Sequence, residues 1–268
     1  FLVCELGMFG SIQKNHNLFD LQKTFYSAAT FNPTYPNHRN PETDSWDQIT
    51  NASQITNPLA WMEVKDHDAT SHISTHARLT FNLFRELKLI LFGSVKITDK
   101  RKGIDYLIEA CKLLAEKHPE WKDSLGVVVF GNQSQQLQDL IPFRVYPLPY
   151  IKNEHELVDI YNAVDLFAIP SLEENLPNMV MEAMSCGVPC VGFNTGGIPE
   201  MIDHLHNGYV AQRKSAEDLA NGIHWILTEP EYAELSAQAC RKAIGNYSES
   251  IIAKKYTDVY NKITGKYA

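Results

Sequence analysis

The sequence predicts an α/β fold in which helices cover both faces of a parallel sheet. From residue 88 onward, short apolar runs alternate with segments whose apolar positions recur at helical spacing. The apolar runs are continuous rather than alternating, which is typical of strands buried on both faces. Sheets of this kind bind ligands beyond the carboxyl ends of their strands, near the point where the strand order reverses. The loops that follow the predicted strands are therefore the places to look for function.

The apolar runs predict six strands, and glycines at 93 and 131 are expected to end the first two of them. The strands are Leu89–Phe92, Val127–Phe130, Val145–Leu148, Leu166–Ile169, Val188–Gly192 and Gly208–Val210. The helices expected between and after them are Gly103–His118, Glu154–Asn162, Asn178–Ser185, Ile198–Asp203, Ser215–Thr228, Glu231–Ile244 and Ser248–Ile263. The run Ser215-Ala216-Glu217-Asp218 resembles a capping box with Asp in place of the usual Glu.

Composition excludes several classes of protein. The 268 residues have room for one large domain or two small ones, and 44% apolar with 21% charged residues excludes a disordered chain, a coiled coil and a collagen-like fibre. The net charge is 24 − 32 = −8, which argues against a nucleic-acid partner. Five scattered cysteines indicate a reducing compartment rather than a disulfide framework. Cys186 and Cys190 are interpreted as packing residues.

The first third of the chain differs from the rest. Residues 1–86 hold two of the 14 glycines and five of the ten histidines, and their periodicity is weak apart from a short helix predicted near residues 18–26. We interpret Asp66-His67-Asp68 as a polar loop rather than a metal site. Residues 1–86 are expected to be an incomplete or divergent domain. A divergent domain, an engineered truncation and segments joined across missing loops remain alternatives.

A basic cluster follows the first predicted strand. Lys100, Arg101 and Lys102 precede the first helix, where the positive end of the helix dipole makes three cations unfavourable. An anion such as phosphate, bound between them and the backbone N–H groups, would explain the cluster. A solvated basic loop explains it equally well.

Two carboxylates follow the fourth predicted strand, with seven residues between them. Glu174 lies in the loop after that strand, where its side chain can reach a ligand directly, and Glu182 lies in the next helix. A helical carboxylate near the loop can accept hydrogen bonds from a diol such as the ribose 2′,3′ pair. Taken alone, two glutamates at this spacing are usually surface charges of a helix. Their position after a buried strand, opposite a basic loop, favours the ligand-binding interpretation.

Several ordered motifs over residues 87–263 resemble the C-terminal domain of family 4 glycosyltransferases, which have the GT-B fold. The family carries Glu-x7-Glu followed by Ala-Met-x-x-Gly-x-Pro-x-Val, and this chain has Glu174-x7-Glu182 followed by a matching run at 183–191. Further matches are Asp99–Gly103, Tyr161–Leu166, Gly196–Glu200 and Asn207–Val210. The resemblance implies a Rossmann-like nucleotide-sugar-binding domain at 87–247. It implies a helix at 248–268 that returns toward an acceptor-side N-terminal region at 1–86.

The resemblance also implies roles for individual residues. Lys102 would contact the diphosphate of the donor, Glu174 would lie near the hydroxyls of the donor sugar, and Glu182 would hold the ribose. The family often has Arg after the first-strand glycine, where this chain has Ser94, and we expect Arg101 to supply that charge. The catalytic set is thus Glu174, Lys102 and Arg101. The other donor-binding positions are Gly93, Ser94, Gly131, Asn132, Tyr150, Ile151, Asn175, Leu176 and Glu182, with Tyr150 and Ile151 beside the base.

By the same resemblance, the function is transfer of a sugar from a nucleotide-sugar donor to a sugar or glycolipid acceptor with retention of configuration. It would serve polysaccharide or glycoconjugate synthesis. No metal or other cofactor is implied, because basic side chains and a helix N-terminus would neutralise the leaving diphosphate. The expected location is the cytoplasm, with peripheral association at the inner face of the membrane as an option. The alternatives are a non-catalytic nucleotide-sugar-binding fragment and another GT-B enzyme, such as a sugar-nucleotide epimerase.

Overall fold

The computed structural model describes residue 74 and residues 77–263. The chain divides into two units, Phe1–Lys65 and Asp66–Ala268, and every described residue belongs to the second. The helix predicted near residues 18–26 and the Asp66-His67-Asp68 loop lie outside the described residues. The second unit begins before residue 87, where the sequence analysis starts the binding domain.

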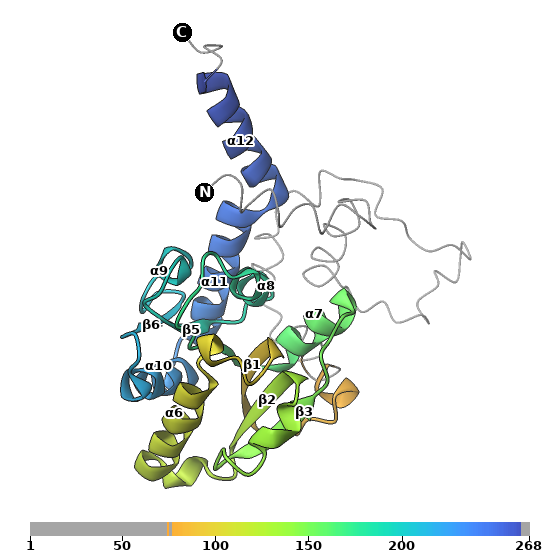
Figure 1. Cartoon of the computed structure of the whole chain (residues 1–268), viewed down its shortest axis with the longest axis vertical. Helices are drawn as coiled ribbons and strands as arrows, with labels where there is room; N and C mark the ends of the chain where they lie inside the picture. Colours follow the sequence, from red (N-terminus) through yellow and green to blue (C-terminus); the bar gives the residue numbers. More distant parts are fainter. Residues whose placement is uncertain (1–73, 75–76, 264–268) are drawn as a thin grey trace, which may run out of the picture. The chain divides into compact units, whose positions relative to one another are not determined.

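Among the described residues, six parallel strands form one sheet in the order β3-β2-β1-β4-β5-β6, which confirms the predicted fold class. Figure 1 shows the sheet with its helices. The strands are β1 (Lys88–Lys96), β2 (Leu125–Asn132), β3 (Arg144–Leu148), β4 (Leu166–Ile169), β5 (Cys190–Phe193) and β6 (Gly208–Ala211). The chain adds strands outward from β1 in one direction and then returns to add β4 on the other side. The strand order therefore reverses between β1 and β4, and the loops after these two strands meet at the switch point.

The first two strands are longer than expected. Gly93 pairs with Phe130 inside the sheet, and β1 continues beyond it to Lys96 after an irregularity in the ladder. The prediction that Gly93 ends the first strand is therefore wrong, and Gly131 likewise lies inside β2. A Cβ at 93 would lie 2.3 Å from the ring of Phe130, so glycine at this position indicates close packing rather than the end of a strand.

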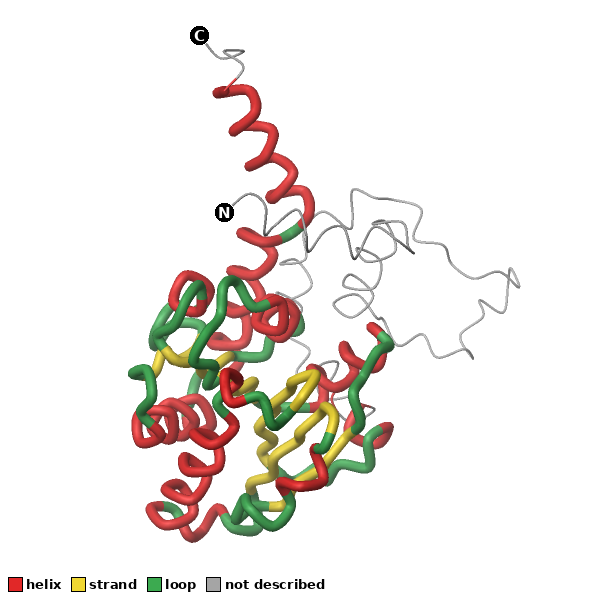
Figure 2. The backbone as a smooth tube through the Cα atoms, viewed as in Figure 1, coloured by secondary structure: helices red, strands yellow, loops and turns green. Residues whose placement is uncertain are grey.

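Helices cover both faces of the sheet, as Figure 2 shows. One face carries α6 (Ile104–Lys117) and α10 (Ala216–Thr228), and the other carries α7 (Glu154–Ala163), α8 (Asn178–Ser185), α9 (Ile198–Met201) and α11 (Tyr232–Tyr247). Three 3₁₀ turns, η1 (Lys100–Lys102), η2 (Pro119–Trp121) and η3 (Ser134–Leu137), lie in the connections. The helix α12 (Glu249–Ile263) follows α11 and extends away from the sheet (Figure 1). No helix among these described residues is long and apolar enough to cross a membrane.

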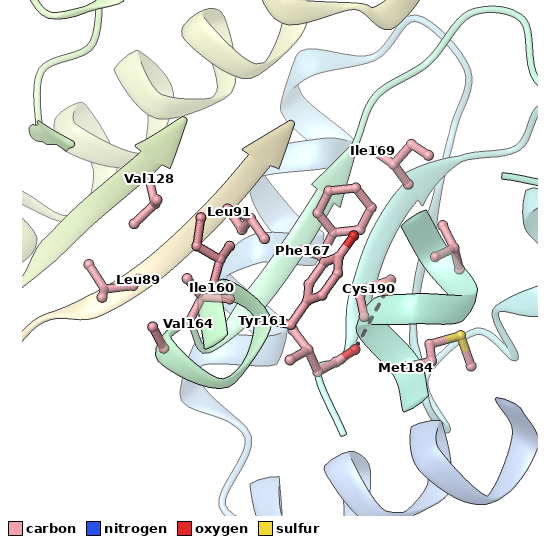
Figure 3. Packing of buried hydrophobic residues seen from close by; sticks show 14 of the residues in the cluster. Leu89, Leu91, Val128, Ile160, Tyr161, Val164, Phe167, Ile169, Met184 and Cys190 are labelled. Atoms are coloured by element: carbon pink, nitrogen blue, oxygen red, sulfur yellow. Dashed lines mark hydrogen bonds between the residues drawn. The ribbon is translucent and has the colours of Figure 1, made fainter. Parts of the chain in front are cut away.

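Two apolar clusters, one on each face, stabilise the layers. Alternate residues of β1 contribute to each: Leu89 and Leu91 pack with α7 and α8, whereas Ile90 and Phe92 pack with α6 and α10. Figure 3 shows part of the first cluster, in which Tyr161 and Phe167 lie beside one another. Cys190 is fully buried there, and burial raises the pKa of its thiol, so its role is packing as expected.

The helix N-terminus at Ser215 differs from the predicted capping box. Ser215 Oγ accepts a hydrogen bond from the backbone N–H of Asp218 at 3.1 Å, which is half of the motif. The carboxylate of Asp218 accepts instead from Tyr209 Oη and from the backbone N–H of Gln212, at 2.8 and 2.6 Å. Tertiary contacts from β6 therefore replace the reciprocal bond, which no local motif could reveal.

Candidate nucleotide-sugar site at the switch point

An aspartate caps the 3₁₀ turn η1 in the loop after β1. Asp99 precedes η1 and accepts hydrogen bonds from the backbone N–H of Arg101 at 3.0 Å and from its guanidinium at 2.8 Å. The hydrogen bond from Arg101 lowers the pKa of Asp99. The charge of Arg101 is thus balanced by Asp99 in this structure, and the side chain is largely exposed. Its expected contact with phosphate stays a prediction.

A backbone contact ties this loop to the loop after β4. Leu172 donates its N–H to the carbonyl of Arg101 at 2.7 Å. Gly103, between η1 and α6, has a φ of 71°, and a Cβ there would lie 1.9 Å from the carbonyl oxygen of Pro170. Glycine at 103 therefore permits both the left-handed turn and the close approach of the two loops. The sequence predicted that both loops follow the carboxyl ends of strands, and the structure brings them into contact because β1 and β4 are neighbours in the sheet.

Lys102 and Glu174 meet across this junction. Lys102 Nζ lies 2.5 Å from Glu174 Oε1, and the side chains are 35% and 12% exposed. The two residues are 72 positions apart. A half-buried ion pair at the carboxyl edge of the sheet places one cation and one carboxylate where a charged ligand would enter.

Glu182 lies in α8, the helix that leaves the same loop. It is half-buried, and one carboxylate oxygen, Oε2, accepts a hydrogen bond from Tyr161 Oη at 2.9 Å. The helix begins after Pro177 with no capping side chain and with no acidic residue in its first turn. Its first backbone N–H groups therefore offer positive partial charge at the strand edge, which suits an anion.

The loop after β5 contacts the segment that carries Glu174. Gly197 donates its N–H to the carbonyl of Asn175 at 2.6 Å, and a Cβ at Gly196 would lie 1.8 Å from the carbonyl oxygen of Glu174. This glycine pair thus supports the segment that carries Glu174. Sequence reasoning noted the Gly-Gly motif without assigning it a place in the site.

The remaining donor-binding residues take various positions around this edge. Gly93 and Ser94 lie inside β1, and Ser94 is buried with its hydroxyl donating to the carbonyl of Lys96 at 3.0 Å. Gly131 has a φ of 139° and packs against the carbonyl of Ser94. These residues shape the backbone at the strand ends.

The side chains expected beside the base and sugar differ in exposure. Asn132 and Asn175 are exposed, and Leu176 is half-buried. Tyr150 is 37% exposed, whereas Ile151 is 8% exposed and belongs to the apolar core. Of the two residues expected at the base, Tyr150 is the one whose side chain can present a surface to a ligand.

A separate open hollow of about 570 Å³ lies at the end of β6. It is lined by Asn194, His204, Tyr209, Val210, Ala211, Gln212, Arg213 and Asp218. None of the residues predicted for the site lines it, so it is not part of the switch-point arrangement.

The sequence family described as "Glycosyl transferases group 1" matches residues 78–243. An uncharacterized glycosyltransferase of Haemophilus influenzae is 26% identical over 194 residues, which are 71% of this chain and 54% of that protein. An uncharacterized glycosyltransferase of Methanocaldococcus jannaschii is 31% identical over 179 residues, which are 65% of this chain and 44% of that protein. The chain therefore spans about half the length of these curated relatives.

Solved structures show the same fold. Anabaena Alr3699/HepE, solved in complex with UDP and glucose, has a TM-score of 0.59 and 21% identity over 71% of this chain and 52% of that one. The C-terminal domain of a Francisella tularensis group 1 glycosyl transferase, LpcC, has a TM-score of 0.54 and 19% identity over 65% of this chain and 92% of that one. The family match covers the sheet, both loops of the switch point and the Lys102–Glu174 pair. By that match this chain belongs to the group 1 glycosyl transferases.

Proposed function

We propose that this chain binds the donor of a retaining glycosyltransferase of the family 4 type. It would transfer a hexosyl group from a nucleotide-diphosphate sugar to a sugar or glycolipid acceptor, in polysaccharide or glycoconjugate synthesis. The observation that carries the proposal is the Lys102–Glu174 pair at the switch point, with Glu182 on the helix that leaves the same loop. This arrangement supplies a cation for phosphate and carboxylates for hydroxyl groups at one edge of the sheet.

Lys102 is proposed to bind the donor diphosphate. In the structure, Glu174 balances the charge of Lys102, with Oε1 2.5 Å from Nζ. A diphosphate carries more negative charge than one carboxylate, so it competes effectively for the ammonium group. Together with the uncapped N-terminus of α8, Lys102 would stabilise the negative charge that develops on the leaving diphosphate without a metal ion.

Glu174 is proposed to turn from Lys102 toward the hydroxyls of the donor sugar once the diphosphate is bound. Its segment is supported from behind by Gly196 and Gly197, which limits how far the backbone can move. A carboxylate in this position orients the sugar, and the acceptor would attack from the face that the diphosphate leaves. Such a front-face reaction retains the anomeric configuration and needs no protein nucleophile.

The nucleotide part of the ligand and the cellular location are proposed from the resemblance and the similar proteins together. HepE, which shares the fold, was solved with UDP and glucose, which supports a nucleoside diphosphate as part of the ligand here. Tyr150 would lie beside its base. We further propose a cytoplasmic enzyme, with peripheral association at the inner face of the membrane when the acceptor is a glycolipid. The acceptor-side domain would come from outside residues 87–263.

The direct test compares Lys102→Ala and Glu182→Ala with the unaltered chain in calorimetric titrations of ADP, GDP and UDP. Loss of a charge-assisted hydrogen bond of about 1.5–3 kcal/mol predicts affinities roughly 10–100 times weaker in each variant. Lys100→Ala is the matched control, because Lys100 belongs to the same 3₁₀ turn and is exposed. Affinities like those of the unaltered chain in both site variants would overturn the proposal. A product assay with labelled donor sugars then separates transfer from binding alone and from epimerisation.

A further inference from the structure

The hydroxyl of Tyr161 has no assigned role, although it contacts the proposed site. Tyr161 lies in the last turns of α7 and is 1% exposed. Its Oη donates a hydrogen bond to Glu182 Oε2 at 2.9 Å. A buried tyrosine hydroxyl normally finds a partner. Here that partner is the carboxylate proposed to hold the ribose.

Packing fixes where this hydroxyl can be. The ring of Tyr161 meets the ring of Phe167 edge to face, with centroids 6.2 Å apart at 86° (Figure 3). Phe167 lies in the centre of the sheet, on β4, and both side chains belong to the core on that face. A tyrosine side chain has only two rotatable angles, so a ring held on β4 holds its hydroxyl in one place.

The hydroxyl is also held in its donor form. Burial, with the neighbouring charge of Glu182 as a second cause, raises the pKa of Tyr161 well above its ordinary value. Tyr161 therefore stays protonated across the physiological range and can donate to a carboxylate throughout it. Since Tyr161 belongs to the apolar core, its hydroxyl holds the carboxylate of Glu182 from the core side.

A carboxylate offers about four positions for hydrogen-bond donors, and the hydroxyl of Tyr161 occupies one of those on Glu182. The orientation of the carboxylate plane decides whether two neighbouring hydroxyls can reach it together. A glutamate side chain has three rotatable bonds, and an oxygen anchored by a rigid donor removes much of that freedom before the ligand arrives. Preorganisation of this kind adds to affinity because less ordering is left for the binding step.

We propose that Tyr161 is a positioning residue that orients Glu182 toward the ribose diol and thereby sets the preference of this site for ribonucleotides over deoxyribonucleotides. The inference rests on the proposed function, because it takes Glu182 as the ribose-binding carboxylate. It adds a second residue, from a different element, on which that specificity depends.

The test uses Tyr161→Phe in the full chain, which keeps the ring and its packing and removes only the hydroxyl. The ligands are UDP, ADP or GDP, whichever the unaltered chain binds best, with its 2′-deoxy and 3′-deoxy counterparts and inorganic pyrophosphate. Loss of one hydrogen bond to a charged group predicts a ribose preference about tenfold smaller in the variant. Affinity for pyrophosphate, which has no ribose, stays unchanged.

Tyr232→Phe is the matched control. Tyr232 also donates a hydrogen bond from its hydroxyl, to the carbonyl of Asp165 at 2.6 Å, just before the start of β4 and away from the loops at the carboxyl ends of the strands. Both variants lose one hydrogen bond from a tyrosine hydroxyl. We expect only Tyr161→Phe to lose the preference for the ribonucleotide over its deoxy counterparts. In a Glu182→Gln background, Tyr161→Phe has little further effect on that preference, because the two residues act as one unit.

The outcomes separate this inference from the function on which it rests. Full ribose preference in Tyr161→Phe, with the nucleoside diphosphate still bound, overturns the role of Tyr161 and leaves the proposed function standing. Equal loss of preference in Tyr161→Phe and Tyr232→Phe also overturns it, because the effect is then one of general stability. If the unaltered chain binds no nucleoside diphosphate, or shows no ribose preference, the ribose-binding role of Glu182 fails and this inference with it.

Discussion

At the residue scale, two partly buried ion pairs join residues that lie far apart in the sequence. Lys102 pairs with Glu174 at the carboxyl edge of the sheet, and Arg78 pairs with Asp165 at the other edge, 87 positions away. The guanidinium of Arg78 also donates to the carbonyls of Ala163, Arg85 and Leu87, so it connects the segment before β1 to the start of β4. We propose a ligand-binding role for the first pair, whereas the second pair joins parts of the fold.

Replacing Arg78 by Met tests the structural explanation. The side chain is 7% exposed, and its removal takes from Asp165 its arginine partner and from several backbone carbonyls their donor, although Asp165 keeps the hydrogen bond from the backbone N–H of Leu89. Breaking a buried ion pair typically costs about 3–5 kcal/mol, and we expect a loss of that size in the free energy of unfolding. Chemical denaturation measures it. Arg85→Met, a change at an exposed side chain nearby, is expected to alter stability little, and equal effects of the two changes would contradict this account.

At the scale of elements, the sequence predicted the helices and strands well and the contacts between loops poorly. All six strands and the helices from α6 to α12 appear where apolar periodicity predicted them, with β4 and α8 matching at both ends. Periodicity reports burial, and burial determines these elements. The predicted end of β1 was wrong because Gly93 packs closely against Phe130 and does not form a turn. Neither the Tyr161–Glu182 bond nor the support of Glu174 by Gly196 follows from spacing, because each depends on how two elements pack.

Gly196 provides the test of that loop support. A Cβ at 196 would lie 1.8 Å from the carbonyl oxygen of Glu174, and its φ is 55°. We expect Gly196→Ala to lower the free energy of unfolding by at least about 1–2 kcal/mol, the cost of a left-handed conformation for a residue with a side chain. Affinity for the nucleotide-sugar donor, measured by calorimetry, falls as well because Glu174, which is proposed to orient the donor sugar, is displaced.

The control is Gly245→Ala, since a Cβ at 245 meets nothing within 4 Å and the residue lies inside α11. Alanine there is expected to raise stability by about 0.4–1 kcal/mol, because it restricts the unfolded chain. An unaltered affinity in Gly196→Ala would show that the glycine pair does not support Glu174.

At the scale of the whole molecule, we expect stability to depend on pH through a stack of aromatic rings between the end of α6 and α10. His118, Trp121 and His224 stack between the end of α6 and α10, with the two imidazole centroids 4.3 Å apart. Burial, followed by the neighbouring His118, lowers the pKa of His224 below its ordinary value of 6.5, while Glu120 opposes the shift. The folded chain therefore resists protonation at His224 more than the unfolded chain does.

The sign of the pH dependence follows from this shift. The unfolded chain binds the proton first as the pH falls through 6.5, so stability is complete above that pH and declines below it. We expect the melting temperature of the unaltered chain to fall when the pH is lowered from 7.5 to 5.5. The melting temperature of His224→Gln falls by less over the same range. His206→Gln, at an exposed histidine, is expected to keep the original pH dependence. The same dependence in all three proteins would count against the stack as its cause.

We propose above all that a nucleoside diphosphate binds at the switch point between β1 and β4. A crystal structure of the full chain with its preferred nucleoside diphosphate tests this most directly. We expect the diphosphate to contact Lys102 and the N-terminus of α8, the ribose to contact Glu182, and Glu174 to have turned away from Lys102. A nucleotide bound elsewhere, for example in the hollow beside Tyr209 and Asp218, with the Lys102–Glu174 pair intact, would contradict it.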